Sequence, residues 1–163
     1  MIFEGIDIFR RRLAADEVLL GSGIGLIDPQ VSEALAESVD FLWIDLEHTA
    51  MSPEAMRGHL MAARGRRRAI VVRLPGSDTA LLKPVLDAGA PGIVVPQVSS
   101  VEEVQGVIDD CRYPPVGRRG FGPLVASDYG RMGEEYVERA NRSVFVSVMI
   151  ECVEAVEFID EIV

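Results

Sequence analysis

Apolar residues along the chain are concentrated in short runs separated by more polar segments. Five such runs cover residues 19–26, 41–47, 69–75, 92–98 and 144–151. Four of them are rich in β-branched residues, which favour strands, and their lengths are typical of strands. We therefore expect a strand in each run.

Helical patterns alternate with these runs. They cover residues 3–15, 29–38, 53–64, 79–88, 100–111 and 153–163. Asp28-Pro29 and Ser52-Pro53 each place a capping side chain before a proline at the first helical position, and Ser100 with Glu103 fits a capping box. Alternating strands and helices predict an α/β fold with a parallel sheet and right-handed crossovers.

The two faces of the last run differ in chemistry. Positions 144, 146, 148 and 150 are β-branched and suit a layer of helices, whereas positions 145, 147, 149 and 151 are mixed and suit a barrel interior. A complete TIM-type (β/α)8 barrel takes about 250 residues. We therefore expect residues 1–163 to form one partial barrel domain with the first five βα units, or alternatively a complete open sheet. Residues 112–143, which are rich in proline and glycine, are expected to form a long functional or disordered loop.

The composition limits the binding partners and the cellular compartment that we expect for the protein. The 163 residues include 16 Lys+Arg and 26 Asp+Glu, which gives a net charge of −10. Such an acidic chain repels phosphate, so we expect no nucleic-acid partner. No apolar run approaches the roughly 20 residues of a membrane span and no signal peptide is recognisable, so we expect no membrane association. Cys111 and Cys152 are the only cysteines, too few for a disulfide framework, and we expect a cytoplasmic protein.

Candidate catalytic residues gather where predicted strands end, and these ends bind ligands in parallel α/β folds. His48 follows Asp45 and Glu47. It is either a general base, since its ordinary pKa of about 6.5 lies near working pH, or a strand-end residue bonded to those carboxylates. Arg73 either binds a substrate carboxylate and stabilises an enolate, or forms an ion pair with Glu47 or Glu151. Glu151 alone is a weak metal signal.

Seven short motifs in register along the chain resemble the HpcH/HpaI aldolase family, whose members cleave 4-hydroxy-2-oxo acids such as 2,4-dihydroxyhept-2-ene-1,7-dioate. The motifs are Asp45-Leu46-Glu47-His48, Val72-Arg73-Leu74-Pro75, Leu86-Asp87-Ala88-Gly89-Ala90, Val94-Val95-Pro96, Arg112-Tyr113-Pro114-Pro115 with Gly117 and Arg119-Gly120, Ala140-Asn141, and Ile150-Glu151. The match extends from about residue 5 to the last residue.

The resemblance implies a TIM barrel that carries out a metal-dependent (class II) retro-aldol reaction. It implies that His48 is the base, that Arg73 binds substrate and stabilises the transition state, that Asp87 raises the basicity of the histidine, and that Glu151 binds the metal. Oxygen ligation implies Mg²⁺ or Mn²⁺, with Co²⁺ as a further option. The substrates implied are a small 2-oxo acid of the pyruvate or oxaloacetate type and an aldehyde.

The lysine and histidine content agrees with a metal-dependent mechanism. A Schiff-base aldolase needs a desolvated lysine at a strand end, and the only lysine, Lys83, falls within a predicted helix. His48 and His59 are too few for a three-histidine zinc site, and His59 lies in mid-helix, where we expect a structural role. An aldolase made from this chain would therefore use a metal held by carboxylates.

Asp87 falls at the end of a predicted helix, on the side of the sheet opposite the strand ends that carry His48. If Asp87 assists a histidine, that histidine belongs to a neighbouring subunit. We therefore expect a homo-oligomer with shared sites, and the resemblance favours a hexamer.

Two departures from the family pattern affect the expected activity. Family members usually carry a substrate-binding glutamine two residues before the metal-binding glutamate, and here that position is Met149. The family's second metal carboxylate, an aspartate on the sixth strand, would fall beyond residue 163. Besides aldol cleavage or formation next to a pyruvate enolate, two alternatives remain. One is a citrate-lyase-β-like or citrate-forming enzyme, and the other is an inactive fragment or pseudoenzyme that acts only in oligomer assembly.

Overall fold

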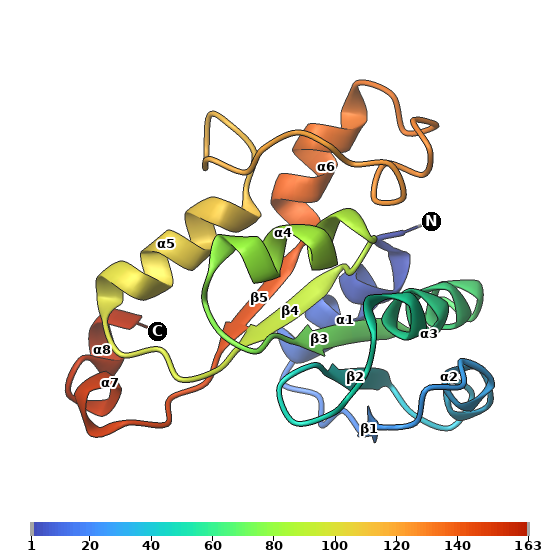
Figure 1. Cartoon of the computed structure of the whole chain (residues 1–163), viewed down its shortest axis with the longest axis horizontal. Coiled ribbons are helices and arrows are strands. Elements are labelled where there is room, and N and C mark those ends of the chain that lie inside the picture. Colours follow the sequence, from blue (N-terminus) through green and yellow to red (C-terminus); the bar gives the residue numbers. More distant parts are fainter. Residues whose placement is uncertain (1, 163) are drawn as a thin grey trace.

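The computed structural model describes residues 2–162 and contains a parallel five-stranded sheet (Figure 1). The strands are β1 (Gly21–Ile24), β2 (Phe41–Asp45), β3 (Ala69–Arg73), β4 (Gly92–Val95) and β5 (Phe145–Val148). They lie side by side in chain order, and each is parallel to the next. The predicted α/β class is confirmed. Each strand ends two or three residues before its apolar run does, so the polar ends of the runs lie in the loops that follow.

Helices occupy all the predicted segments. They are α1 (Glu4–Leu13), α2 (Gln30–Leu35), α3 (Pro53–Gly65), α4 (Thr79–Asp87), α5 (Val101–Cys111), α6 (Glu135–Ser143), α7 (Val153–Glu157) and α8 (Ile159–Ile162). The predicted caps form: Ser52 Oγ accepts a hydrogen bond from the Ala55 N–H (3.2 Å), and Ser100 Oγ accepts one from the Glu103 N–H (3.2 Å). None of the helices within residues 2–162 has the length and apolarity that crossing a membrane requires.

The prediction of one continuous helix over residues 153–163 is wrong. It is divided into α7 and α8, which separate at Phe158, and residue 163 lies outside the described part of the chain. Glu154, Glu157 and Glu161 fall at spacings of three and four residues. Like charges at these spacings repel one another on one helix face, which disfavours a continuous helix.

The segment 112–143 is not a loop throughout, because its last nine residues form helix α6. The helix is strongly polar, and only Tyr136, Ala140 and Ser143 are buried, at the spacing of one narrow helical face. The preceding loop is anchored to this helix: the Tyr113 N–H donates to Asn141 Oδ1 (2.7 Å), and Asn141 Nδ2 donates to the Tyr113 carbonyl (3.1 Å). Tertiary contacts therefore stabilise a helix that the apolar pattern does not reveal.

Helix α1 covers the inner face of the sheet near the N-terminal ends of the strands. The Phe9 ring packs edge-on against Phe41 of β2 (5.1 Å between centroids) and Phe145 of β5 (5.5 Å). A Cβ atom on Gly5 would lie 2.4 Å from the backbone carbonyl of Arg68, so only glycine allows this approach. The opposite face of β2, β3 and β4 is buried beneath helices, as we expect for a barrel wall.

Candidate active site

The register of β2 and β3 places a negatively charged and a positively charged side chain opposite each other. Asp45 is the last residue of β2, Arg73 is the last residue of β3, and the two are paired positions in the sheet. Both side chains lie at the carboxyl ends of the strands, where βα loops form ligand sites in parallel folds.

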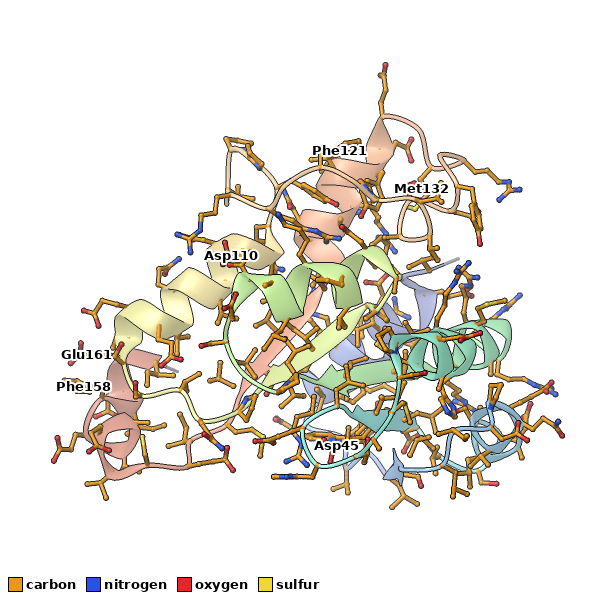
Figure 2. All side chains as sticks on the ribbon, in the orientation of Figure 1. Asp45, Asp110, Phe121, Met132, Phe158 and Glu161 are labelled. Atoms are coloured by element: carbon orange, nitrogen blue, oxygen red, sulfur yellow. The ribbon has the colours of Figure 1, made fainter. Side chains whose placement is uncertain are left out.

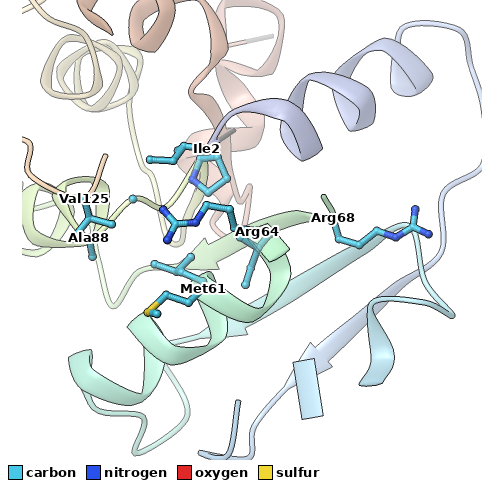
Figure 3. Close-up of a pocket in the computed structure, with 10 residues that line it drawn as sticks. Ile2, Met61, Arg64, Arg68, Ala88 and Val125 are labelled. Carbon is cyan, nitrogen blue, oxygen red and sulfur yellow. The ribbon is translucent and has the colours of Figure 1, made fainter. Parts of the chain in front are cut away.

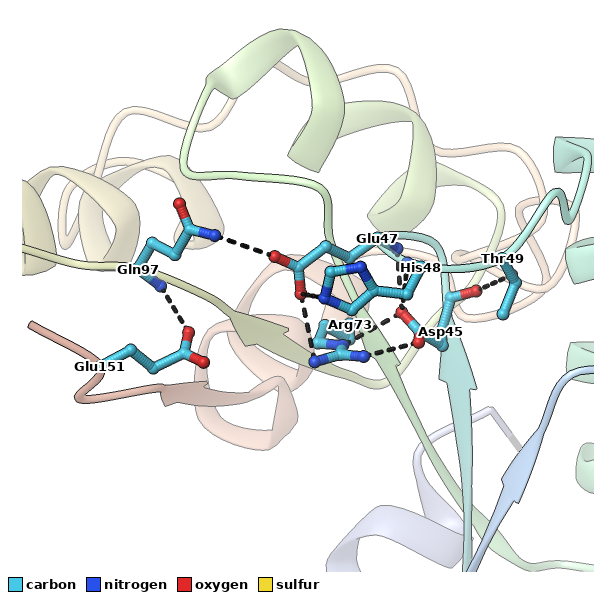
Figure 4. A network of polar contacts seen from close by, with 7 residues as sticks. All are labelled: Asp45, Glu47, His48, Thr49, Arg73, Gln97 and Glu151. Atoms are coloured by element: carbon cyan, nitrogen blue, oxygen red, sulfur yellow. Dashed lines mark hydrogen bonds and ion pairs between the residues drawn. The ribbon is translucent and has the colours of Figure 1, made fainter.

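Asp45 and Arg73 form a bidentate ion pair (Figure 4). Arg73 Nε donates to Asp45 Oδ1 (3.0 Å), and Arg73 Nη2 donates to Asp45 Oδ2 (2.6 Å). Each side chain is only 15% exposed. The hydrogen bonds from Arg73 hold the pKa of the Asp45 carboxyl below its ordinary value of 3.8, although burial acts in the opposite direction. The same bonds raise the pKa of Arg73. The pair is therefore fixed in its charged form.

Glu47 and His48 are held by the turn that follows β2. Asp45 Oδ1 accepts hydrogen bonds from the N–H groups of Glu47 (2.9 Å) and His48 (3.2 Å). This turn brings Glu47 Oε2 to 3.1 Å from Arg73 Nη1 and to 3.5 Å from His48 Nε2. The His48 side chain is 69% exposed, whereas Glu47 is only 10% exposed. In the cluster of Asp45, Glu47, His48 and Arg73, His48 is thus the most exposed side chain.

Gln97 and Glu151 extend the cluster toward β5. The Gln97 N–H donates to Glu151 Oε2 (3.0 Å), and Gln97 Nε2 donates to Glu47 Oε1 (3.3 Å). Figure 4 shows both contacts of Gln97, one with each glutamate. Gln97, Glu151 and Cys152 line a hollow of about 500 Å³ with Ser99 and Glu154.

The structure brings together His48, Arg73 and Glu151 in this region of the molecule. Of the two alternatives for Arg73, the ion pair with Glu47 forms (3.1 Å), and a shorter one forms with Asp45 (2.6 Å). The sequence indicates Asp45 only as a partner for His48 and gives no indication of Gln97. Asp45 can be identified from the sequence, because Asp45 and Glu47 alternate with apolar residues at the end of an apolar run.

Asp87 and Met149 lie apart from the contacts of this cluster. Met149 directly follows β5, is half-buried, and its N–H donates to the Val95 carbonyl (2.9 Å). Asp87 ends α4 and accepts a hydrogen bond from the buried guanidinium of Arg119 (2.8 Å). A Cβ atom on Gly122 would lie 3.9 Å from Asp87 Oδ2, so Asp87 lies beside the segment that carries Phe121. Figure 2 shows Phe121 far from Asp45.

The hollow in Figure 3 offers no comparable chemistry. It lies at the opposite end of the sheet and is lined by Ile2, Leu60, Met61, Arg64, Arg68, Ile70, Ala88, Gly89, Pro91 and Val125. Its lining contains two arginines but no acid, histidine or cysteine. The cluster at the carboxyl ends of the strands is therefore the better candidate for an active site.

The cluster fits a metal that takes most of its ligands from outside the protein. Within residues 2–162, no group of three or more His, Cys, Asp or Glu side chains is arranged to hold a metal ion. Asp45 is occupied by Arg73, and of the two glutamates that line the hollow, Glu151 and Glu154, it is Glu151 that contacts Gln97. Mg²⁺ is commonly bound by one or two carboxylates together with waters and substrate oxygens. Glu151 suits this mode of binding.

A parallel sheet whose strands lie side by side in chain order, with a charged cluster at their carboxyl ends, is typical of part of a TIM barrel. The sequence profile of the HpcH/HpaI aldolase/citrate lyase family matches residues 28–163, and the chain belongs to this family.

Individual relatives agree with this assignment. A hydroxypyruvate/pyruvate aldolase from Roseovarius nubinhibens is 36% identical over 159 residues, which cover 96% of this chain and 62% of that protein. A 4-hydroxy-2-oxovalerate aldolase from Novosphingobium aromaticivorans is 34% identical over 159 residues, which cover 96% of this chain and 60% of that protein. The crystal structure of an HpcH/HpaI aldolase/citrate lyase family protein from Burkholderia cenocepacia has a TM-score of 0.88 at 29% identity, covering 95% of this chain and 63% of that chain. The chain thus spans about three fifths of the length of these relatives.

Proposed function

We propose that this protein is a divalent-metal-dependent aldolase that cleaves or forms a C–C bond next to a pyruvate enolate. In the cleavage direction, a 4-hydroxy-2-oxo acid would give pyruvate and an aldehyde. The observation that carries the proposal is the Arg73 guanidinium, which Asp45 and Glu47 hold at the carboxyl ends of the strands beside the exposed His48. Residues 1–163 would form one partial barrel domain of this enzyme.

Arg73 has the hydrogen-bonding capacity to bind the substrate. A guanidinium has five N–H groups, and the contacts with Asp45 and Glu47 use three of them. One N–H on each terminal nitrogen remains for a substrate carboxylate or for the oxygen that becomes negative as the enolate forms. Because the two carboxylates hold the guanidinium in place, it would need little reorganisation during the reaction.

His48 would move the proton. Its imidazole would take the proton of the C4 hydroxyl as the C3–C4 bond breaks, and would return it to C3 of the enolate. Glu47 Oε2, 3.5 Å from His48 Nε2, would stabilise the imidazolium that forms between these steps. The exposure of His48 allows the substrate to reach it.

Glu151 would hold the metal, Mg²⁺ or Mn²⁺ with Co²⁺ as a further option, together with waters and substrate oxygens. When bound, the cation would polarise the keto oxygen of the 2-oxo acid. Gln97 orients the carboxylate by donating its backbone N–H to Glu151 Oε2.

A second copy of the chain would complete the site. Asp87 is fixed by Arg119 beside the loop 112–134, far from the cluster of its own subunit. We propose a homo-oligomer, with the hexamer implied by the family resemblance, in which Asp87 approaches His48 of a neighbouring copy. We also propose that the protein is cytoplasmic, since its two cysteines are too few for a disulfide framework.

Met149 supports a second candidate, a citrate-type enzyme that uses oxaloacetate. Its side chain cannot donate a hydrogen bond, so the bound 2-oxo acid would differ from that of relatives with an amide at this position.

The test is pyruvate formation from 4-hydroxy-2-oxovalerate by the purified protein, with Mg²⁺ or Mn²⁺ added and after chelation with EDTA. We expect cleavage only with metal, and the variant Glu151→Gln should need at least about tenfold more metal, as metal-site changes commonly cost 10–100-fold in affinity. Glu154→Gln is the matched control, because Glu154 lines the same hollow. Cleavage that survives EDTA would refute the metal dependence. Turnover of oxaloacetate without aldol cleavage would favour the citrate-type enzyme, and no turnover of either would favour an assembly role.

A further inference from the structure

Gln97 occupies an unusual position in the cluster. It follows β4 and Pro96 with a backbone φ of +54°, in the left-handed region that disfavours most residues other than glycine. This turn directs its backbone N–H to Glu151 and its side-chain amide to Glu47, at 3.0 and 3.3 Å. The residue thus connects two carboxylates that lie in the loops after different strands, β2 and β5.

The orientation of the Gln97 amide follows from its partner. The Glu47 carboxylate can only accept hydrogen bonds, so the amide nitrogen, rather than the oxygen, must face it. This contact uses one of the two amide hydrogens. Within residues 2–162, neither the second hydrogen nor the amide oxygen has a hydrogen-bond partner, and the side chain is exposed at the hollow it shares with Ser99 and Glu151. Figure 4 shows the amide oxygen directed away from both glutamates.

The carboxylates around Gln97 create a need for hydrogen-bond donors that can face an anionic substrate. Asp45, Glu47 and Glu151 bring three carboxylates to the cluster, and the Arg73 guanidinium is already paired with two of them. A 2-oxo acid is itself an anion, so its oxygens need donors that offset this negative charge. The side chain of Met149, which directly follows β5, provides no hydrogen-bond donor.

We propose that Gln97 is a substrate-binding residue that determines specificity by donating its free amide hydrogen to an oxygen of the 2-oxo acid. This inference rests on the proposed aldolase function. The Glu47 contact pre-orients the amide, so the donor is in place before the substrate arrives.

The side-chain contribution of Gln97 can be separated from that of its backbone. Gln97→Gly removes the amide but keeps the N–H that Glu151 accepts, and glycine adopts a φ of +54° without strain. Gln97→Met keeps the length of the side chain without its donor. Asp16→Gly is the matched control, because Asp16 is exposed, has a φ of +57° and lies outside the cluster.

The experiment measures KM and kcat for 4-hydroxy-2-oxovalerate cleavage by the wild-type protein and the three variants, with Mg²⁺ present. We expect Gln97→Met and Gln97→Gly to raise KM about 10- to 100-fold, the loss expected for a hydrogen bond to a charged group. kcat should change less than about threefold, since the bond forms in both the bound and the transition states. Asp16→Gly should match the wild type, and thermal unfolding should confirm that each variant is folded.

The outcomes separate this inference from the proposed function. An active wild-type protein whose KM is unchanged in both Gln97 variants would overturn the inference and leave the aldolase proposal intact. A wild-type protein that cleaves no 4-hydroxy-2-oxo acid with any divalent metal would overturn both. A large fall in kcat with unchanged KM would also overturn the binding role.

Discussion

Asp45 and Arg73 face each other at the same register position of neighbouring parallel strands, and both oxygens of the Asp45 carboxylate accept hydrogen bonds from the Arg73 guanidinium. The same carboxylate also accepts two backbone N–H groups of the turn that carries Glu47 and His48. Asp45 therefore positions three other residues of the cluster while remaining bound to protein groups itself.

Replacing Asp45 with Asn should destabilise the protein by about 1–3 kcal/mol, because hydrogen bonds to charged groups contribute about 1.5–3 kcal/mol each and the side chain is partly solvated. The pKa of Asp45 is lower in the folded state than its ordinary value of 3.8, so its ionic contribution is present above that pH and is lost as the pH falls through the folded-state pKa. Urea unfolding between pH 2 and 7 should show a smaller acid-dependent loss for Asp45→Asn than for the wild type. The exposed Asp16→Asn is the control, and an equal loss in all three proteins would contradict the prediction.

His59 should produce a second pH dependence, unrelated to the active site. It is fully buried on α3, its Nδ1 lies 2.8 Å from Ser32 Oγ, and burial lowers its pKa below the ordinary value of 6.5. As the pH falls below 6.5, the unfolded chain binds a proton that the folded protein does not, so stability decreases down to the folded-state pKa. The slope should reach at most about 1.4 kcal/mol per pH unit. Unfolding free energies of His59→Gln should lack this slope, whereas those of His48→Gln should retain it.

Loss of His48 should remove catalysis without affecting the fold. A positioned general base contributes about 10²- to 10⁴-fold, so His48→Gln should lower kcat for aldol cleavage by a factor in this range. Its thermal unfolding should match that of the wild type, because the side chain is 69% exposed. Exchange of the C3 protons of pyruvate with deuterated water, followed by NMR, should stop in the same variant. Exchange at the wild-type rate would exclude His48 as the base.

A mixed oligomer tests the shared site. Asp87→Asn and His48→Asn proteins should each be nearly inactive alone. After they are denatured together and refolded at equal amounts, activity should return to about a quarter of the wild-type level, because random assembly of a closed oligomer then pairs an intact His48 with an intact Asp87 at that frequency. No recovery in an oligomer shown to contain both chains would place Asp87 and His48 in the same subunit or remove Asp87 from the reaction.

The strands could be predicted because local features determine them. Runs such as 69–75 are short and β-branched, and a parallel sheet then follows from their alternation with capped helices. Helix α6 could not be predicted in this way, because its narrow buried face around Tyr136 is stabilised by contacts with the loop near Tyr113, 23 residues earlier.

Long-range contacts also explain which site residues were missed. His48, Arg73 and Glu151 stand at the ends of apolar runs and can be found from their positions alone. Gln97 becomes a candidate only when its contacts with Glu47 and Glu151, 50 and 54 residues away, are known. The local sequence around Gln97 carries no sign of either contact.

Helix α1 has a consequence for the route by which a ligand enters. Phe9 packs against Phe41 and Phe145 where the strands begin, and the buried Ile6 lies against Gly92, the first residue of β4. Helix α1 thus covers the end of the sheet where the strands begin, whereas the opposite end carries the exposed imidazole of His48. If the proposed aldolase function holds, the loops at that end of the sheet are the part of the described chain that would select among aldehydes of different size and charge.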